Sequence, residues 1–192
     1  MNVWVIGNGQ SRKNFALGSI HEFTIGCNAV YRDYSCDELV AVDMRMVNEM
    51  LTKNVQTPIH TRQDWADHYT DRRVRFLPNL PFTGTTKADQ PFHWNSGPYA
   101  ILLSAIKEPK EIHLLGFDLW SKDHLVNNIY KDTANYAKAS TSSIDPHLWI
   151  YQLERLFNHY SHINFVQHQE TNWRIPDSWK AIKNLTIKYD VV

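Results

Sequence analysis

The stretch VWVIGNGQS, residues 3–11, decides the fold of this chain. Its first four residues are β-branched or aromatic and predict a short buried strand. Gly7 and Gly9 end that strand, and Ser11 is expected to cap a helix that begins at Arg12. A strand, a glycine turn and a helix N-terminus together present backbone N–H groups that suit a phosphate. A lone glycine turn is equally compatible with a tight connection that binds no ligand.

Short apolar runs elsewhere continue the pattern and predict a parallel sheet. Strands are expected within 21–31, at 39–42, within 57–61 and 73–77, at 110–118, and at 163–168 as the last strand. Helices are expected after residue 43, briefly around Trp65, at 96–108 and at 145–160, the last with Asp145 as N-cap and Pro146 in its first turn. This alternation predicts an α/β fold, a single Rossmann-like domain over 1–192 whose mostly parallel sheet is flanked by helices.

One long polar segment, residues 119–143, has little periodicity and is expected to form a loop or lid. It carries three lysines and two tyrosines, which would suit closure over a polyanionic ligand. A solvated surface loop explains the same composition equally well.

The overall composition excludes several classes of protein. Basic and acidic residues balance at 20 each, which argues against a general nucleic-acid-binding surface. No apolar run approaches the roughly 20 residues of a membrane span, and the first residues lack the pattern of a signal peptide. Two cysteines, Cys27 and Cys36, are too few for a disulfide framework. We therefore expect free thiols and a cytoplasmic protein.

Small or polar residues recur where the predicted strands end and where the helix at 96–108 begins. In an open parallel sheet, ligands bind outside the carboxyl ends of the strands. Five clusters at corresponding positions therefore predict a ligand pocket, although each alone is ordinary turn chemistry. The clusters are Gly7-Asn8-Gly9, Cys27-Asn28, Asp43, Asn95-Ser96-Gly97 and Gly116-Phe117-Asp118.

Three stretches carry a resemblance to a known family. VWVIGNGQS, IGCNAVY and NSGPYAILLSAIKEPKEIHLLGFDLW are similar to sequences of the bacterial sialyltransferases of glycosyltransferase family 42. The same superfamily holds the flagellin-modifying motility accessory factors and the archaeal 6-hydroxymethylpterin diphosphokinases. The resemblance covers about residues 2–120, with a looser continuation to 157. It implies a Rossmann-like sheet, a nucleotide held at the strand ends, a flexible lid and compatibility with a homo-oligomer.

The resemblance also implies roles for individual residues. Asn8 and Gly9 would face the phosphate and ribose, and Asn28 would bond the nucleotide or the donor sugar. Ser96 and Gly97 would bind the phosphate at a helix N-terminus, with Asp118 beside the nucleotide. Further nucleotide-binding positions would be Gly7, Ser11, Asp43, Asn95 and Gly116. Trp120 and Tyr130 fall near two tyrosines that contact the leaving phosphate in these enzymes, and His147 falls near their general base.

Three departures from the family pattern keep other functions open. Gln10 replaces the proline of the glycine turn, Trp120 has no hydroxyl group, and Asp43 stands where the sialyltransferases tend to have asparagine. Asp43 and Asp118 would suit Mg²⁺ in a diphosphokinase of the pterin type. The third hypothesis is a non-catalytic relative that only binds a nucleotide. For Asp43 we favour a helix cap over a metal ligand, and no histidine or cysteine spacing is typical of a zinc site.

The leading hypothesis is a nucleotide-sugar-dependent glycosyltransferase, with a CMP-linked sugar as donor substrate and no resident cofactor. Inverting transfer needs a base for the acceptor hydroxyl, and a histidine suits that role because its pKa lies near neutrality. His147 is the candidate, with Asp145 placed to orient it. An inconsequential helix-start residue is the alternative, because 10 histidines are scattered along the chain. The acceptor stays open among glycan, lipid-linked sugar, protein and nucleobase.

Overall fold

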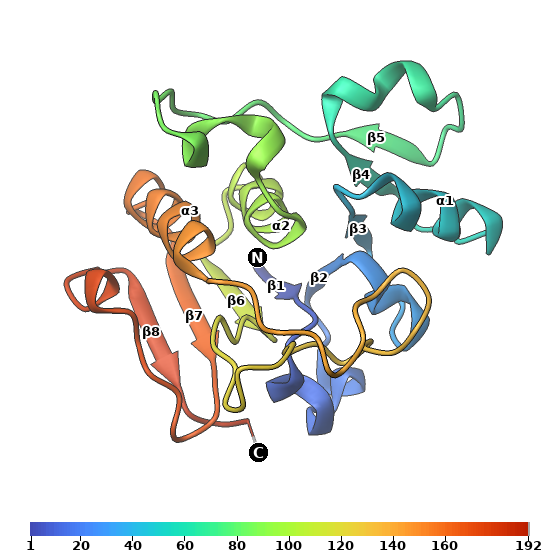
Figure 1. Ribbon diagram of the computed structural model, residues 1–192. Helices are drawn as coiled ribbons and strands as arrows, with labels where there is room; N and C mark the ends of the chain where they lie inside the picture. Colours follow the sequence, from blue (N-terminus) through green and yellow to red (C-terminus); the bar gives the residue numbers. More distant parts are fainter. Residues whose placement is uncertain (192) are drawn as a thin grey trace.

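The computed structural model describes residues 1–191 and contains a parallel sheet of eight strands in the order β5-β4-β3-β2-β1-β6-β7-β8 (Figure 1). The fold is therefore the Rossmann-like α/β class that the sequence predicts. The strands are β1 (Asn2–Ile6), β2 (Phe23–Cys27), β3 (Glu38–Val40), β4 (Ile59–Thr61), β5 (Val74–Phe76), β6 (Glu111–Leu115), β7 (Asn164–His168) and β8 (Leu185–Lys188).

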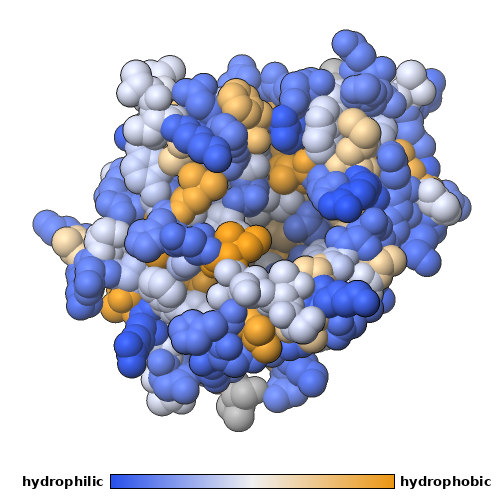
Figure 2. All heavy atoms as spheres, in the orientation of Figure 1, coloured by the Kyte–Doolittle hydropathy of each residue, from blue (hydrophilic) through white to orange (hydrophobic). Residues whose placement is uncertain are grey.

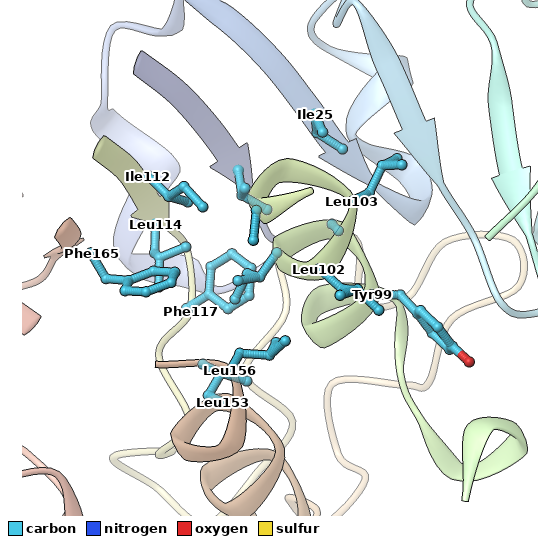
Figure 3. Packing of buried hydrophobic residues seen from close by; sticks show 14 of the residues in the cluster. Ile25, Tyr99, Leu102, Leu103, Ile112, Leu114, Phe117, Leu153, Leu156 and Phe165 are labelled. Carbon is cyan, nitrogen blue, oxygen red and sulfur yellow. The ribbon is translucent and has the colours of Figure 1, made fainter. Parts of the chain in front are cut away.

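Helices cover both faces of this sheet. On one face, α2 (Ser96–Ala105) and α3 (His147–His159) pack over the central strands; Figure 3 shows Leu102 of α2 and Leu156 of α3 pointing into the same core as Leu114 of β6. On the other face, α1 (Met44–Thr52) contributes Met46 and Met50 to a second core. Every residue of α2 except Gly97 is buried, which explains why its sequence is apolar all round.

Strand β1 lies at the centre and shows why residues 3–6 form an unbroken apolar run. Val3 and Val5 belong to the core under α2 and α3, whereas Ile6 belongs to the core under α1. Because successive side chains of a strand point to opposite faces, a strand covered on both sides needs apolar residues at consecutive positions.

The strand order reverses direction beside β1. From β1 the chain proceeds through β2, β3, β4 and β5 on one side, and it then returns to add β6, β7 and β8 on the other. The carboxyl ends of β1 and β6 therefore flank a topological switch point, the place where open α/β sheets leave a crevice for ligands.

Several predicted elements differ in detail. The helix expected from Arg12 is a 3₁₀ helix, Gln10–Asn14, with Gly9 rather than Ser11 at its N-cap, because the Ser11 side chain is engaged by Asp118. The brief helix around Trp65 is likewise a 3₁₀ helix, Gln63–His68.

The last helix and the end of the sheet also differ from expectation. Helix α3 begins at His147 with Pro146 at its N-cap; Asp145 lies one position earlier, and its carboxylate accepts the His147 N–H at 3.0 Å. The prediction that 163–168 is the last strand was wrong, because β8 pairs with β7 along the edge. Half of β8 is solvent-exposed, so it lacks the apolar run that identified the other strands.

None of the helices within residues 1–191 combines the length and the apolar character needed to cross a membrane.

Candidate functional site

A cavity of about 400 Å³ lies at the carboxyl edge of the sheet, over the switch point. In Figure 2 this face of the molecule is hollowed near its centre, with hydrophobic residues beside the hollow on a mostly hydrophilic surface. The lining comes from the ends of β1, β2 and β6, the starts of α1 and α2, segment 119–143 and α3. Ten sequence-predicted nucleotide-binding residues line it: Gly7, Asn8, Gly9, Asn28, Asp43, Asn95, Ser96, Gly97, Gly116 and Asp118. Ser11 is the predicted position that does not.

The glycine turn after β1 is packed tightly against the end of β6. The Gly7 N–H donates to the Leu115 carbonyl at 2.7 Å, and the Gly9 N–H donates to the Gly116 carbonyl at 2.9 Å. A Cβ atom at Gly7 would lie 2.6 Å from the Gly116 carbonyl oxygen. Both glycines are thus required by the close approach of two chain segments, and neither N–H is free for a phosphate.

Asp118 connects the end of β6 to the 3₁₀ helix that follows β1. Its carboxylate accepts a hydrogen bond from the Ser11 N–H at 2.9 Å and a second from the Ser11 hydroxyl. Burial raises the pKa of Asp118, and the hydrogen bonds from Ser11 oppose that rise. Asp118 therefore forms a buried polar wall of the cavity and holds the turn that carries Ser11.

The start of α2 is tied to the ends of β2 and β3. The Ser96 hydroxyl donates to Asn28 Oδ1 at 2.8 Å and accepts the Val42 N–H at 3.1 Å. Asn28 has a φ of 52°, a left-handed conformation that asparagine tolerates better than most residues. Within residues 1–191 the Asn28 Nδ2 group has no partner, so it is available to a ligand in the cavity.

The N-terminus of α2 supplies the free backbone donors of the site. The Asn95 side chain makes no capping hydrogen bond, and Pro98 has no N–H. No hydrogen-bond acceptor from residues 1–191 pairs with the N–H groups of Ser96 and Gly97. Since the helix dipole adds a partial positive charge here, these two N–H groups are suited to an anion.

Segment 119–143 closes over the cavity and is anchored to the glycine turn. In Figure 1 it crosses in front of the strand ends before it returns to α3. Asn8 makes two hydrogen bonds to this segment. Its carbonyl accepts the Ile129 N–H at 2.9 Å, and its Nδ2 donates to the Tyr136 hydroxyl at 2.9 Å. The Gln10 N–H donates to Asn127 Oδ1 at 2.8 Å. Asn8 Oδ1 is buried and has no partner within residues 1–191.

Asp43 caps α1, which agrees with the role that the sequence favours for it. Its carboxylate accepts the Arg45 N–H at 2.9 Å and pairs with the Arg45 guanidinium at 3.1 Å. Asp118 is likewise engaged, by Ser11. Within residues 1–191, no group of three or more histidine, cysteine, aspartate or glutamate side chains is placed to hold a metal ion.

The three predicted catalytic residues lie outside the lining of this cavity. The Tyr130 hydroxyl is buried, accepts from Arg12 at 2.7 Å and donates to Asp33, and burial raises its pKa. Trp120 lies against the segment after β7, where its indole N–H donates to the Arg174 carbonyl at 2.7 Å.

His147, the third of these residues, lies in the first turn of α3 between two lining residues, Ile144 and Trp149. Its side chain is 86% exposed and its Nδ1 contacts Asp145. The ring is therefore held by a carboxylate but faces solvent rather than the cavity.

The sequence predicts that 119–143 forms a loop or lid, but it does not predict which residues of segment 119–144 and of α3 line the cavity. These residues are Leu119, Ser121, Val126, Asn127, Asn128, Ser143, Ile144, Trp149 and Leu153. For Trp149 a signal exists, because it precedes Leu153 by four residues and therefore lies on the same side of the helix. For the loop residues there is no periodic signal, and only the hydrogen bonds to the glycine turn place them.

Comparison with solved structures shows the fold of the chain. No protein-family model matches the sequence, and no curated protein matches it. The sialyltransferase CstII from Campylobacter jejuni, solved with the substrate analogue CMP-3FNeuAc, is 16% identical with a TM-score of 0.50, over 86% of this chain and 79% of that chain. The same enzyme with cytidine-5'-monophosphate gives 17% identity and a TM-score of 0.48, over 86% and 78%. The chain thus has the fold of that sialyltransferase.

Proposed function

We propose that the protein is a nucleotide-sugar-dependent glycosyltransferase and that the nucleotide binds in the cavity at the switch point. The observation that carries the proposal is the group of free donors at one end of that cavity. The N–H groups of Ser96 and Gly97 and the Nδ2 group of Asn28 have no partner within residues 1–191. Donors at a helix N-terminus bind phosphate oxygens and stabilise a leaving phosphate.

The charge of the lining favours a donor with a single phosphate. No lysine or arginine of residues 1–191 lines the cavity, whereas Asp43 and Asp118 do. Sites for nucleoside triphosphates usually pair the phosphates with Lys, Arg or a bound cation. A CMP-linked sugar carries one phosphate, which a helix N-terminus can bind without a cationic side chain. Asp43 and Asp118 are already engaged by Arg45 and Ser11, which disfavours their use as Mg²⁺ ligands in a diphosphokinase.

We propose His147 as the general base. The acceptor oxygen forms a bond to the anomeric carbon while the bond from that carbon to the phosphate oxygen breaks. The electron pair leaves with the nucleotide phosphate, and the proton of the acceptor hydroxyl passes to Nε2 of His147. Asp145 contacts Nδ1 of the ring, so it would stabilise the protonated imidazole. For this step the acceptor hydroxyl must reach the exposed ring, which lies in the sequence between two lining residues of the cavity, Ile144 and Trp149.

Thermal unfolding with CMP, UDP, GDP, AMP and ATP, each with and without Mg²⁺, tests the proposal. We expect CMP to raise the melting temperature without Mg²⁺, because a ligand at a hundred times its Kd stabilises the native state by about 2.7 kcal/mol. Ser96→Ala should weaken CMP binding by about tenfold, since it removes a hydroxyl that fixes Asn28.

The matched control is Ser104→Ala at the other end of α2, where the hydroxyl bonds only to the Ala100 carbonyl. That variant should bind CMP as the original chain does. Stabilisation by ATP that requires Mg²⁺ would instead support the diphosphokinase, and no stabilisation by any nucleotide would overturn the proposal.

A further inference from the structure

Arg12 is the only buried lysine or arginine within residues 1–191, and only 2% of its surface is exposed. It belongs to the 3₁₀ helix Gln10–Asn14 that follows the glycine turn, and it does not line the cavity at the switch point. Moving a guanidinium out of water carries a large free-energy cost, so a buried arginine needs compensating partners. Its partners show where the charge of Arg12 acts.

The Arg12 guanidinium is bonded to three separate segments of the chain. Its Nε donates to the Gly7 carbonyl at 2.6 Å, and its Nη2 donates to the Tyr130 hydroxyl at 2.7 Å. Its Nη1 pairs with Asp33 at 3.3 Å. A Cβ atom at Gly116 would lie 3.2 Å from Arg12 Cδ, so the side chain passes directly behind that residue. The charge therefore lies behind Gly7 and Gly116, which both line the cavity.

The hydrogen bond to Gly7 acts on a peptide group whose N–H is free. The Gly7 carbonyl and the Asn8 N–H belong to the same peptide group, and no acceptor from residues 1–191 pairs with this N–H. Asn8 also lines the cavity. A charged donor at the carbonyl polarises the peptide group and strengthens its N–H as a donor. Arg12 therefore strengthens a free backbone donor in the wall of the cavity.

The negative partner of Arg12 is more exposed to water than Arg12 itself. The Asp33 side chain is 42% exposed, against 2% for Arg12, and Asp33 does not line the cavity. Because water screens an exposed charge more strongly than a buried one, Asp33 cancels only part of the field of Arg12. This field reaches Cys27, another lining residue. Burial raises the pKa of the Cys27 thiol and Cys36 adds to the rise, whereas Arg12 opposes it.

We propose that Arg12 is a positioning residue for the phosphate of the nucleotide and acts from behind the cavity wall through the peptide group of Gly7 and Asn8. The lining holds two aspartates and no lysine or arginine of residues 1–191, so a charge behind the wall supplies an attraction that the lining lacks. Because three partners already fix the guanidinium, it needs no rearrangement when a phosphate binds. This role rests on the proposed function, since it requires a nucleotide in that cavity.

Isothermal titration calorimetry with CMP and with cytidine tests this role, because the two ligands differ only in the phosphate. Arg12→Gln should weaken CMP binding by about tenfold and leave cytidine binding unchanged, whereas a purely structural role would weaken both alike. Arg12→Lys keeps the positive charge and should retain most of the CMP affinity. Lys13→Gln is the matched control: it removes the same charge from an exposed position of the same 3₁₀ helix and should leave CMP binding unchanged.

Asp33→Asn tests the same charge without changing Arg12. Asparagine keeps the shape of the side chain but removes the charge that opposes Arg12. CMP should therefore bind about twofold or more tighter, with cytidine binding unchanged. Circular dichroism establishes that each variant is folded, and this variant decides the question if Arg12→Gln does not fold.

The proposal is overturned if the ratio of CMP affinity to cytidine affinity stays the same in Arg12→Gln or in Asp33→Asn. An equal loss of CMP affinity in Arg12→Lys and Arg12→Gln would also overturn it, because the charge would then be irrelevant. If CMP does not bind to the original chain, the proposed function fails and this role fails with it. If CMP binds and only the ratio is unaffected, the role of Arg12 alone is refuted.

Discussion

Gly9 has an ordinary backbone conformation, with φ −63° and ψ 150°, which any residue can adopt. Its requirement for glycine therefore comes from space alone. A Cβ atom there would lie 2.4 Å from the Asp118 Cγ atom, inside the contact distance of two carbons. Asp118 cannot move aside freely, because it is buried and bonded twice to Ser11. At the residue scale, the site depends on this close approach.

We expect Gly9→Ala to destabilise the protein by about 1–3 kcal/mol, since the added methyl group overpacks a closed contact. It should also weaken CMP binding, because the shift of Asp118 alters the cavity wall. Gly18→Ala is the matched control: a Cβ at Gly18 meets nothing within 4 Å, so its effect should stay within about 0.5 kcal/mol. Urea unfolding measures both variants, and equal stabilities would contradict the packing argument.

A second prediction at the residue scale concerns His147, whose substitution should change the rate of catalysis but not the stability of the protein. His147→Ala should lower the turnover of sugar transfer by about 10²–10⁴-fold, because the acceptor hydroxyl loses its base. The free energy of unfolding and the affinity for CMP should stay unchanged, since the side chain is 86% exposed and does not line the cavity. The readout is transfer from a CMP-linked sugar, compared with His21→Ala at an exposed position outside the cavity lining, which should keep full activity. Full activity of His147→Ala would refute the assignment.

At the scale of elements, segment 119–143 behaves as part of the folded domain. Its longest-range anchor is the Tyr136 hydroxyl, which accepts from Asn8 Nδ2 at 2.9 Å and from the Ala29 N–H at 3.3 Å. Arg32 adds hydrogen bonds to the Thr133 hydroxyl at 2.8 Å and to the Ala134 carbonyl at 2.9 Å. The segment therefore links the ends of β1 and β2, and its position sets the shape of the cavity.

Tyr136→Phe should destabilise the protein by about 1–3 kcal/mol, because it leaves the donors of Asn8 and Ala29 without their acceptor. Proteolytic cleavage within 119–143 should become faster, since the segment loses its anchor to the glycine turn. Tyr189→Phe at a half-exposed position is the control and should change neither property. Limited proteolysis followed by mass spectrometry locates the cut, and identical digestion of both variants would count against this role of the segment.

At the scale of the whole molecule, the face of the sheet opposite α2 and α3 contains a buried histidine pair. His113 Nδ1 lies 3.0 Å from His168 Nε2, and His168 Nδ1 lies 2.9 Å from Asp190. Both imidazole rings stack on Trp4, with centroids 4.5 and 4.7 Å from the indole. Burial lowers the pKa of both histidines, although Glu111 and Asp190 oppose the effect and Lys188 adds to it.

These lowered pKa values make stability depend on pH. Above about pH 6.5 histidines are neutral in both states, so the stabilisation is fully present. As pH falls below that value, the unfolded chain binds protons before the folded one does, and the free energy of unfolding decreases. Urea unfolding between pH 8 and pH 5 should show this decline. His113→Phe should reduce the slope, whereas substitution of the exposed His21 by glutamine should not; a pH-independent stability would contradict the prediction.

The sequence by itself determined seven of the eight strands, the parallel sheet and most of the polar side of the cavity. Apolar runs such as 3–6 and 39–42 are local signals, because burial on both faces requires consecutive apolar residues. Small and polar residues at Asn8, Asn28 and Ser96 were also readable, since parallel strands bring their carboxyl ends to one edge. Strand β8 was not predicted, because half of its residues are exposed and it therefore contains no apolar run.

Only the tertiary structure decided which groups are free and which are already bonded. Ser11 was a predicted nucleotide-binding position, but its N–H donates to Asp118, a residue 107 positions away. The N–H of Gly9 likewise donates to the Gly116 carbonyl. Tyr130, predicted at the phosphate, is held by Arg12 and Asp33 beneath the loop. No local pattern encodes such partners, because each hydrogen bond depends on how close two distant segments pack, and that distance is set by the side chains of the whole core.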